Sequence, residues 1–284
     1  MTSTSGSGSA SGVAFVGLGN LGGAMCRRLV AVGHRVAAYD VSADALAAAV
    51  EAGATGAGSA ADAARGASVV CVMVNTDEQA IDVVTGPDGV LAGLAPGAVV
   101  VLHSTVAPST VDRLAAACEL LDAGISGGPD RAAAGTLVTV VGGSVEALAV
   151  ARPTLEAYCS DVIHCGPSGT GMAAKLARNL AQYGIWCALF ESMQLAERAG
   201  VDLGLYADYV RASGLPENHD VILARDTVDP VTDPDRLTHL RWAVQLGHKD
   251  LADAFELATR LGLEVPFAHL ADTTYARAMG LDDT

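Results

Sequence analysis

The chain has 284 residues and a formal net charge of −15, and about half of its residues are hydrophobic. This length is ample for one large or two medium domains with a buried core. The negative charge argues against nucleic acid or an anionic membrane as a partner, because both attract basic surfaces. No apolar run is long enough for a membrane span, and the Ser/Gly-rich segment 1–11 lacks signal-peptide features and is predicted to be a flexible tail.

The six cysteines and seven histidines are scattered along the chain. The cysteines form no CxxC pair, and the histidines show no metal-ligand spacing. This pattern predicts free cysteines in a reducing cytoplasm and no metal site.

Short apolar runs in the first part of the chain alternate with helical stretches, which predicts an α/β domain. Strands that are buried on both faces of a sheet have continuous apolar sequences of this kind. We therefore expect a mostly parallel, doubly wound sheet of the Rossmann type over residues 12–165. The predicted strands are 13–16, 35–39, 69–74, 98–102, 121–125 and 137–141.

The pattern changes near residue 166, beyond which only amphipathic helical segments follow. The first helix is expected from about 169 to 199, with Gly200 as its stop. A helix of this length is expected to join the two domains. The sequence therefore predicts an all-helical substrate and oligomerisation domain over residues 166–284.

The segment Gly17-Leu18-Gly19-Asn20-Leu21-Gly22 follows the first strand and opens a helix, as in a dinucleotide-binding fingerprint. Its glycines permit a tight turn, close approach of a pyrophosphate and close helix packing. Asp40 ends the second predicted strand, at the offset of a ribose-binding carboxylate. Asp40 could instead simply cap the next helix, but together the two features predict a nucleotide site.

Asp40 also bears on the choice of cofactor. A carboxylate there accepts hydrogen bonds from ribose hydroxyls and repels a 2′-phosphate. Val41 and Ser42, which follow it, offer no arginine for such a phosphate. The sequence therefore favours NAD over NADP.

Two candidate catalytic elements follow. The turn Ser126-Gly127-Gly128 can aim backbone N–H groups and a hydroxyl at a carboxylate, although an isolated turn of this kind is usually structural.

Lys175 and Asn179 share a helix face at i and i+4. Lys175 and Lys249 are the only lysines beside fifteen arginines, and only lysine can exchange a proton near neutral pH; chance survival on a solvated face is the alternative.

These segments resemble the β-hydroxyacid dehydrogenase family, which includes 3-hydroxyisobutyrate, tartronate semialdehyde and 6-phosphogluconate dehydrogenases. The resemblance covers nearly the whole chain after the tail. It is carried by four segments in order: the fingerprint through Met25, residues 122–135, residues 169–179 and Lys249-Asp250-Leu251. His103-Ser104-Thr105 and the following residues also look like the Ser-Thr segment that the family places near the nicotinamide.

The resemblance implies NAD(P)-dependent oxidation of a small β-hydroxyacid, unphosphorylated because the chain is too short for 6-phosphogluconate dehydrogenase. It implies that Lys175 is the acid/base, that Ser126, Gly127 and Gly128 hold the substrate carboxylate, and that Asn179 orients the substrate. The cofactor-binding residues are then Gly17, Leu18, Gly19, Asn20, Leu21, Gly22, Asp40, Asn75, Ser104, Thr105 and Lys249. As a base, Lys175 must be neutral, so its pKa must fall from about 10.4, a direction that burial favours.

Three positions depart from the family pattern. Gly124 replaces a common proline and is expected to loosen the turn before Ser126. His103 replaces a more usual acidic residue, and Val74-Asn75-Thr76 replaces a more typical Leu-Pro run. We expect these changes to affect cofactor-side details more than the chemistry.

Two other functions remain open. An imine reductase of the same architecture generally lacks the lysine at the position of Lys175, and a non-catalytic nucleotide-binding protein would be expected to have lost the catalytic motifs. The apolar run 185–195 predicts burial between subunits, so a homodimer or homotetramer is expected.

Overall fold

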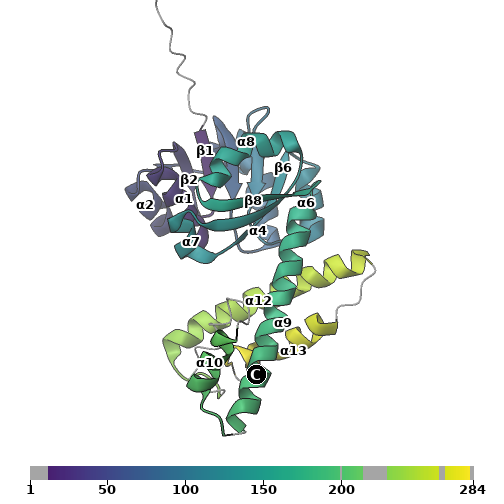
Figure 1. The fold of residues 1–284 in the computed structure, drawn as a ribbon. Coiled ribbons are helices and arrows are strands. Elements are labelled where there is room, and N and C mark those ends of the chain that lie inside the picture. The colour runs from purple at the N-terminus through teal and green to yellow at the C-terminus, as the bar shows by residue number, and fades with distance from the viewer. Residues whose placement is uncertain (1–11, 199, 214–228, 262–265, 282–284) are drawn as a thin grey trace, which may run out of the picture. The chain divides into compact units, whose positions relative to one another are not determined.

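The computed structural model describes residues 12–198, 200–213, 229–261 and 266–281 (Figure 1). The segment 1–11, predicted to be a flexible tail, lies outside the described residues. The chain divides into two compact units, residues 1–175 and 176–284. This division falls within the first long helix, whereas the domain boundary expected from the sequence lies ahead of that helix.

The first unit is built on an eight-stranded sheet with the strand order β3-β2-β1-β4-β5-β6-β7-β8. All neighbouring strands are parallel except β6 and β7, which pair antiparallel. The predicted doubly wound, mostly parallel sheet is therefore confirmed. The strands are β1 (Gly12–Val16), β2 (Val36–Tyr39), β3 (Thr55–Gly56), β4 (Ala67–Val72), β5 (Val99–Leu102), β6 (Leu120–Ser126), β7 (Leu137–Gly142) and β8 (Cys159–Gly166).

Helices cover both faces of this sheet. Val13 and Phe15 of β1 lie in a core formed with residues of α1, α7 and α8, while the alternate residues Ala14 and Val16 are buried on the other face. Because both faces are covered, the central strands are apolar at nearly every position. The helices are α1 (Asn20–Ala31), α2 (Ala43–Glu51), α3 (Ala60–Ala64), α4 (Asp77–Thr85), α5 (Val90–Gly93), α6 (Pro108–Ala115), α7 (Gly128–Ala134) and α8 (Val145–Glu156).

The sequence did not predict β3 and β8. β3 contains only two residues. β8 is an edge strand, and most of its side chains are exposed or half-buried. A strand of that kind needs no continuous apolar run, so it leaves no strong pattern in the sequence.

The second unit is helical in its described part, as predicted. The helix α9 (Thr170–Arg198) starts in the first unit and continues into the second, close to the predicted limits. It is followed by α10 (Leu203–Ala212), α12 (Pro234–Leu261) and α13 (Pro266–Ala278). α12 and α13 each begin at a proline, which suits the first turn because its N–H would have no helical partner there.

In the described part of the second unit, the core draws on α9, α10, α12 and α13. Phe190 and Met193 of α9 are buried in one cluster with Leu203 of α10, Leu251 of α12 and Tyr275 of α13. Part of the apolar run 185–195 is therefore buried within the unit itself, which reduces the surface that this run could offer to a partner.

Two predictions concern the chain as a whole. All six cysteines are free, and Cys26, Cys71, Cys159 and Cys187 are buried. Within the part of the chain that the structure describes, no helix is both long and apolar enough to cross a membrane.

Candidate active site

The glycine-rich loop after β1 is shaped by close backbone packing. Gly17 has a φ of 91°, and a Cβ there would lie 2.1 Å from the carbonyl oxygen of Met73. A Cβ on Gly22 would lie 2.1 Å from the carbonyl oxygen of Gly17. A Cβ on Gly19 would meet nothing within 4 Å, so this glycine faces open space. Gly17 and Gly22 thus hold the loop against the sheet, and Gly19 leaves room for a ligand.

Asp40 fixes this loop from the end of β2. Its Oδ2 accepts a hydrogen bond of 2.5 Å from the Leu18 N–H, and its Oδ1 accepts one of 2.7 Å from the Ser42 N–H. Each carboxylate oxygen can accept a second bond, which leaves capacity for ribose hydroxyls. The following Val41 is almost fully exposed.

The arrangement fits a dinucleotide. α1 begins at Asn20 without a side-chain cap, so its first N–H groups and the positive end of its dipole favour an anion. The structure brings together here the predicted cofactor-binding residues Gly17, Leu18, Gly19, Asn20, Leu21, Gly22 and Asp40. These residues would hold the diphosphate and the adenosine ribose of NAD.

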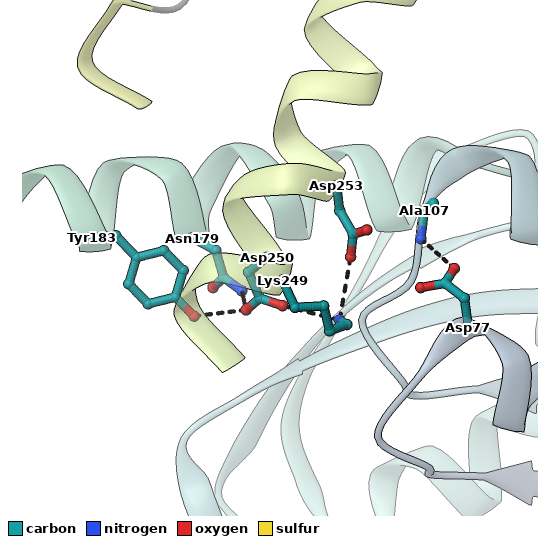
Figure 2. A network of polar contacts seen from close by, with 7 residues as sticks. All are labelled: Asp77, Ala107, Asn179, Tyr183, Lys249, Asp250 and Asp253. Atoms are coloured by element: carbon teal, nitrogen blue, oxygen red, sulfur yellow. Dashed lines mark hydrogen bonds and ion pairs between the residues drawn. The ribbon is translucent and has the colours of Figure 1, made fainter. Parts of the chain in front are cut away.

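Two more loops adjoin the carboxyl ends of β4 and β5, and polar contacts tie them together. The Ser104 hydroxyl accepts a hydrogen bond of 2.7 Å from the Val74 N–H, and Asp77 accepts one of 2.8 Å from the Ala107 N–H (Figure 2). The Asn75 N–H donates to the Gln79 side chain at 3.0 Å. These loops carry the predicted cofactor-binding residues Asn75, Ser104 and Thr105.

His103 points into the core, away from these loops. Its Nδ1 lies 2.9 Å from the Ala123 carbonyl oxygen, and its Nε2 lies 2.9 Å from the Tyr158 hydroxyl. Since a carbonyl only accepts, Nδ1 carries the proton and Nε2 accepts from Tyr158. Burial lowers the pKa of His103 to about 4, so the ring is neutral. His103, which stands where the family more usually has an acidic residue, is therefore part of the buried core.

Lys175 and Ser126 meet in the first unit. Lys175 is only 9% exposed, and its Nζ donates to the Ser126 Oγ at 3.4 Å. Ser126 ends β6, and the next two residues, Gly127 and Gly128, have φ values of 134° and 77°. These values lie in the region that favours glycine, so the turn after Ser126 depends on these two residues.

Gly124 has a different role from the one expected. It lies within β6, paired with Val140 of β7, so the turn before Ser126 is not loosened. A Cβ on Gly124 would lie 2.6 Å from Cβ and 2.8 Å from Cγ of Lys175. The bare backbone at Gly124 therefore gives the aliphatic part of Lys175 its place against the strand.

Asp122 was not among the predicted site residues. It is fully buried on β6, where its Oδ1 accepts from the Gly169 N–H at 2.8 Å and its Oδ2 accepts from the Met172 N–H at 2.6 Å. Burial raises the pKa of Asp122, and hydrogen bonds from backbone N–H groups oppose the rise. The carboxyl group caps the start of α9, one turn before Lys175.

The second unit contains its own polar network, centred on Asp250 of α12 (Figure 2). Asp250 is 4% exposed, and its Oδ2 accepts from Asn179 Nδ2 at 2.8 Å and from the Tyr183 hydroxyl at 2.6 Å. Lys249 Nζ lies 3.1 Å from Asp250 Oδ1 and 3.2 Å from Asp253 Oδ2. The predicted residues Asn179 and Lys249 thus meet through a shared carboxylate.

Asp250 and Tyr183 belong to this network and were not among the predicted site residues. Asp250 directly follows Lys249 in a helix, and a carboxylate in that position is a signal that the sequence contains. Tyr183 stands at i+4 from Asn179, on the same face of α9, so helical spacing could have linked the two. Burial and the neighbouring Asp250 carboxylate raise the pKa of Tyr183, which keeps its hydroxyl a proton donor.

Models of two protein families match nearly all of the described chain. Residues 12–166 match the NAD-binding domain of 6-phosphogluconate dehydrogenase. Residues 169–283 match a domain described as the NAD-binding part of NADP-dependent 3-hydroxyisobutyrate dehydrogenase.

Named relatives give the same picture. A 3-hydroxyisobutyrate dehydrogenase and an NAD-dependent L-serine dehydrogenase of Pseudomonas aeruginosa are each 37% identical, over 71% of this chain and 69% of theirs. A Mycobacterium tuberculosis 3-hydroxyisobutyrate dehydrogenase solved with L-serine is 32% identical, with a TM-score of 0.78 and 96% of both chains covered. An imine reductase from Pseudomonas sp. has a TM-score of 0.61 at 22% identity and shares the fold alone.

Proposed function

The chain belongs to the β-hydroxyacid dehydrogenase family of NAD(P)-dependent oxidoreductases, and from this premise we propose that it oxidises a small, unphosphorylated β-hydroxyacid to its semialdehyde or keto acid. Relatives named for 3-hydroxyisobutyrate and L-serine make these two compounds the first candidates.

One observation carries the proposal, namely the contact between Lys175 Nζ and the Ser126 hydroxyl at 3.4 Å. Ser126 and the N–H groups of Gly127 and Gly128 would bind the substrate carboxylate. The hydroxyl group on the β-carbon of the substrate would then lie within reach of the Lys175 amine. A carboxylate-binding turn beside a residue that can exchange a proton is what oxidation of a hydroxyacid requires.

The proposed chemistry divides between the chain and the cofactor. The hydroxyl proton passes to neutral Lys175 while the hydride on the same carbon leaves, and the carbon–oxygen double bond forms. In the reverse direction, protonated Lys175 donates to the carbonyl oxygen. NAD, when bound, supplies the hydride acceptor.

Asn179 would orient the substrate from the next turn of α9. Its Nδ2 group donates to Asp250 at 2.8 Å, which fixes the orientation of the amide. Lys249 is held by Asp250 and Asp253 and would contribute a positive charge near the cofactor or substrate.

NAD is the supported cofactor, since residues 12–166 match an NAD-binding domain and the related L-serine dehydrogenase is named NAD-dependent. Asp40 favours NAD over NADP because its carboxylate would repel a 2′-phosphate. Side-by-side kinetics with the two cofactors measure this preference, and faster turnover with NADP would contradict it.

The direct test of the function is a panel of β- and γ-hydroxyacids with NAD, followed by the absorbance of the NADH formed. We expect turnover of at least one small β-hydroxyacid. Absence of turnover with every hydroxyacid and both cofactors would contradict the proposed function.

Lys175→Arg tests the acid/base role, because arginine keeps the charge but cannot exchange a proton near neutral pH. We expect kcat to fall by roughly a hundredfold or more. Near wild-type turnover in this variant would show that the acid/base assignment is wrong.

Two alternatives have distinct outcomes in the same assays. Reduction of a cyclic imine without activity on any hydroxyacid would indicate an imine reductase. Binding of NAD without any turnover would indicate a non-catalytic nucleotide-binding protein.

The assembly and location remain part of the proposal. A homodimer or homotetramer is supported by the exposed apolar side chains Val201, Leu205 and Tyr209 at and within α10, and a cytoplasmic location by six free cysteines. Light scattering on the eluting protein measures the assembly, and a monomeric mass would contradict it.

A further inference from the structure

Three alternate residues of β6 contact the start and the first turns of α9. Asp122, Gly124 and Ser126 project from the same face of the strand, because successive residues alternate between faces. The neighbouring Leu121 and Ala123 lie in the core of the opposite face. The strand thus presents a carboxylate, a bare backbone position and a hydroxyl in a row.

Each of the three meets a different part of α9 within the first unit. The Asp122 carboxylate binds the N–H groups of Gly169 and Met172. Gly124 receives the Cβ and Cγ atoms of Lys175, and Ser126 accepts a hydrogen bond from its Nζ. The contacts run from the helix start to the end of the lysine side chain.

The close fit leaves little freedom for the helix to shift along the strand. A Cβ on Gly171 would lie 2.2 Å from the Asp122 carbonyl oxygen, so the backbones of α9 and β6 are in direct contact there. Asp122 also supplies what α9 lacks at its start, since the first N–H groups of any helix have no partner within it. The negative charge further suits the positive end of the helix dipole.

From this geometry we propose that Asp122 is a positioning residue for Lys175. Asp122 fixes the position of α9 along β6 so that the lysine Nζ reaches Ser126. Gly124 also helps to position Lys175, because it provides the space that the lysine side chain occupies. This inference rests on the proposed function for its catalytic meaning, but the placement of Lys175 can be measured without turnover.

The chain offers a direct probe of that placement, since Lys175 and Lys249 are its only lysines. Protein labelled with ¹³C at lysine Cε gives two lysine NMR signals, assigned with Lys175→Arg and Lys249→Arg. Their pH titrations report the two surroundings separately. Lys249 serves as an internal control because its ion partners belong to the second unit.

The test variant is Asp122→Asn, which keeps the shape of the side chain but replaces one acceptor with a donor. We expect kcat to fall by roughly tenfold to a hundredfold, as for a small misplacement of a reacting group. The Km for the hydroxyacid and the Kd for NAD should stay near wild type. The titration of Lys175 should change, and that of Lys249 should not.

The matched control is Leu148→Ala, which removes a buried side chain from α8 on the other face of the sheet. It should lower the Tm while both lysine titrations and kcat stay unchanged. If Asp122→Asn behaves in the same way, or moves both lysine signals alike, Asp122 has only a structural role and the proposal is wrong.

Gly124→Ala covers the case in which Asp122→Asn does not fold. The added methyl group would meet the Lys175 side chain at 2.6 Å and displace it. A selective change in the Lys175 titration is expected, and an unchanged Lys175 signal would overturn the proposal. If the wild-type protein turns over no hydroxyacid, the proposed function fails, whereas a selective Lys175 response in these variants still supports the positioning role.

Discussion

Lys175 and Lys249 have different surroundings, which explains why they should respond differently to substitution. Lys175 contacts a neutral hydroxyl, whereas Lys249 lies between the carboxylates of Asp250 and Asp253. Under the proposed function, Lys175 must exchange a proton and Lys249 must supply a positive charge. Arginine can supply a charge but cannot transfer a proton near neutral pH.

We therefore expect Lys249→Arg to reduce kcat much less than Lys175→Arg. Lys249→Met should lower the free energy of unfolding by roughly 3 kcal/mol, because it removes the Lys249 cation from the buried carboxylates of Asp250 and Asp253. Steady-state kinetics and urea unfolding of the three variants measure both effects. Equal loss of kcat in the two arginine variants would contradict the distinction.

Residues in continuous motifs could be predicted from the sequence, and those that act through distant partners could not. Gly17 and Asp40 belong to a spacing that directly reflects the geometry of a nucleotide site. Asp122 contacts Gly169 and Met172, far along the chain, so neither its partners nor its role can be read locally. One signal was present, since a carboxylate within an apolar strand must find hydrogen bonds when it is buried.

At the scale of elements, α9 and α12 are joined through Asp250. Tyr183 and Asn179 of α9 both donate to this carboxylate, which lies on α12. Rings of Tyr183 and Tyr275 also meet, with centroids 5.2 Å apart. The hydrogen bonds fix the two helices at the level of Asn179, and the rings extend the contact to α13.

Tyr183→Phe removes one donor from this junction while keeping the ring contact. We expect the free energy of unfolding to fall by about 1.5 kcal/mol, the lower range for a hydrogen bond to a charged group, because two donors remain on Asp250. Urea unfolding measures the loss. The Km for the hydroxyacid should rise if Asn179 loses its fixed orientation, and unchanged stability and Km would show that the hydroxyl is not needed.

Strands were predictable where they are buried on both faces, since burial there demands apolar residues at every position. β4 and β5 are of this kind, whereas β8 at the sheet edge is not. The helix α9 was predictable from its length without proline. The antiparallel pairing of β7 with β6 was not, because it depends on the path of the chain through α7.

At the scale of the whole molecule, His103 makes stability depend on pH. Its pKa is about 4 in the folded protein, against 6.5 for an ordinary histidine. The unfolded chain therefore takes up a proton below pH 6.5 that the folded chain refuses until about pH 4. The contribution of neutral His103 to the free energy of unfolding is fully present above pH 6.5 and is lost as the pH falls toward 4.

We expect the wild-type protein to lose up to about 3 kcal/mol of stability across this window through His103 alone. His103→Gln should be less stable at pH 7 but should show a smaller loss between pH 6.5 and 4. Urea unfolding of both proteins at several pH values measures the difference, and parallel pH profiles would contradict it.

The carboxylate of Asp122 also has a consequence for the order of folding. Its helix partners lie 47 and 50 residues further along the chain, so α9 can gain this cap only after β6 is in place. Closing a loop of this length costs conformational entropy, and we expect this contact to form after the transition state. Asp122→Asn should then speed unfolding while leaving the refolding rate nearly unchanged, and stopped-flow kinetics in urea would show whether the helix that carries Lys175 docks last.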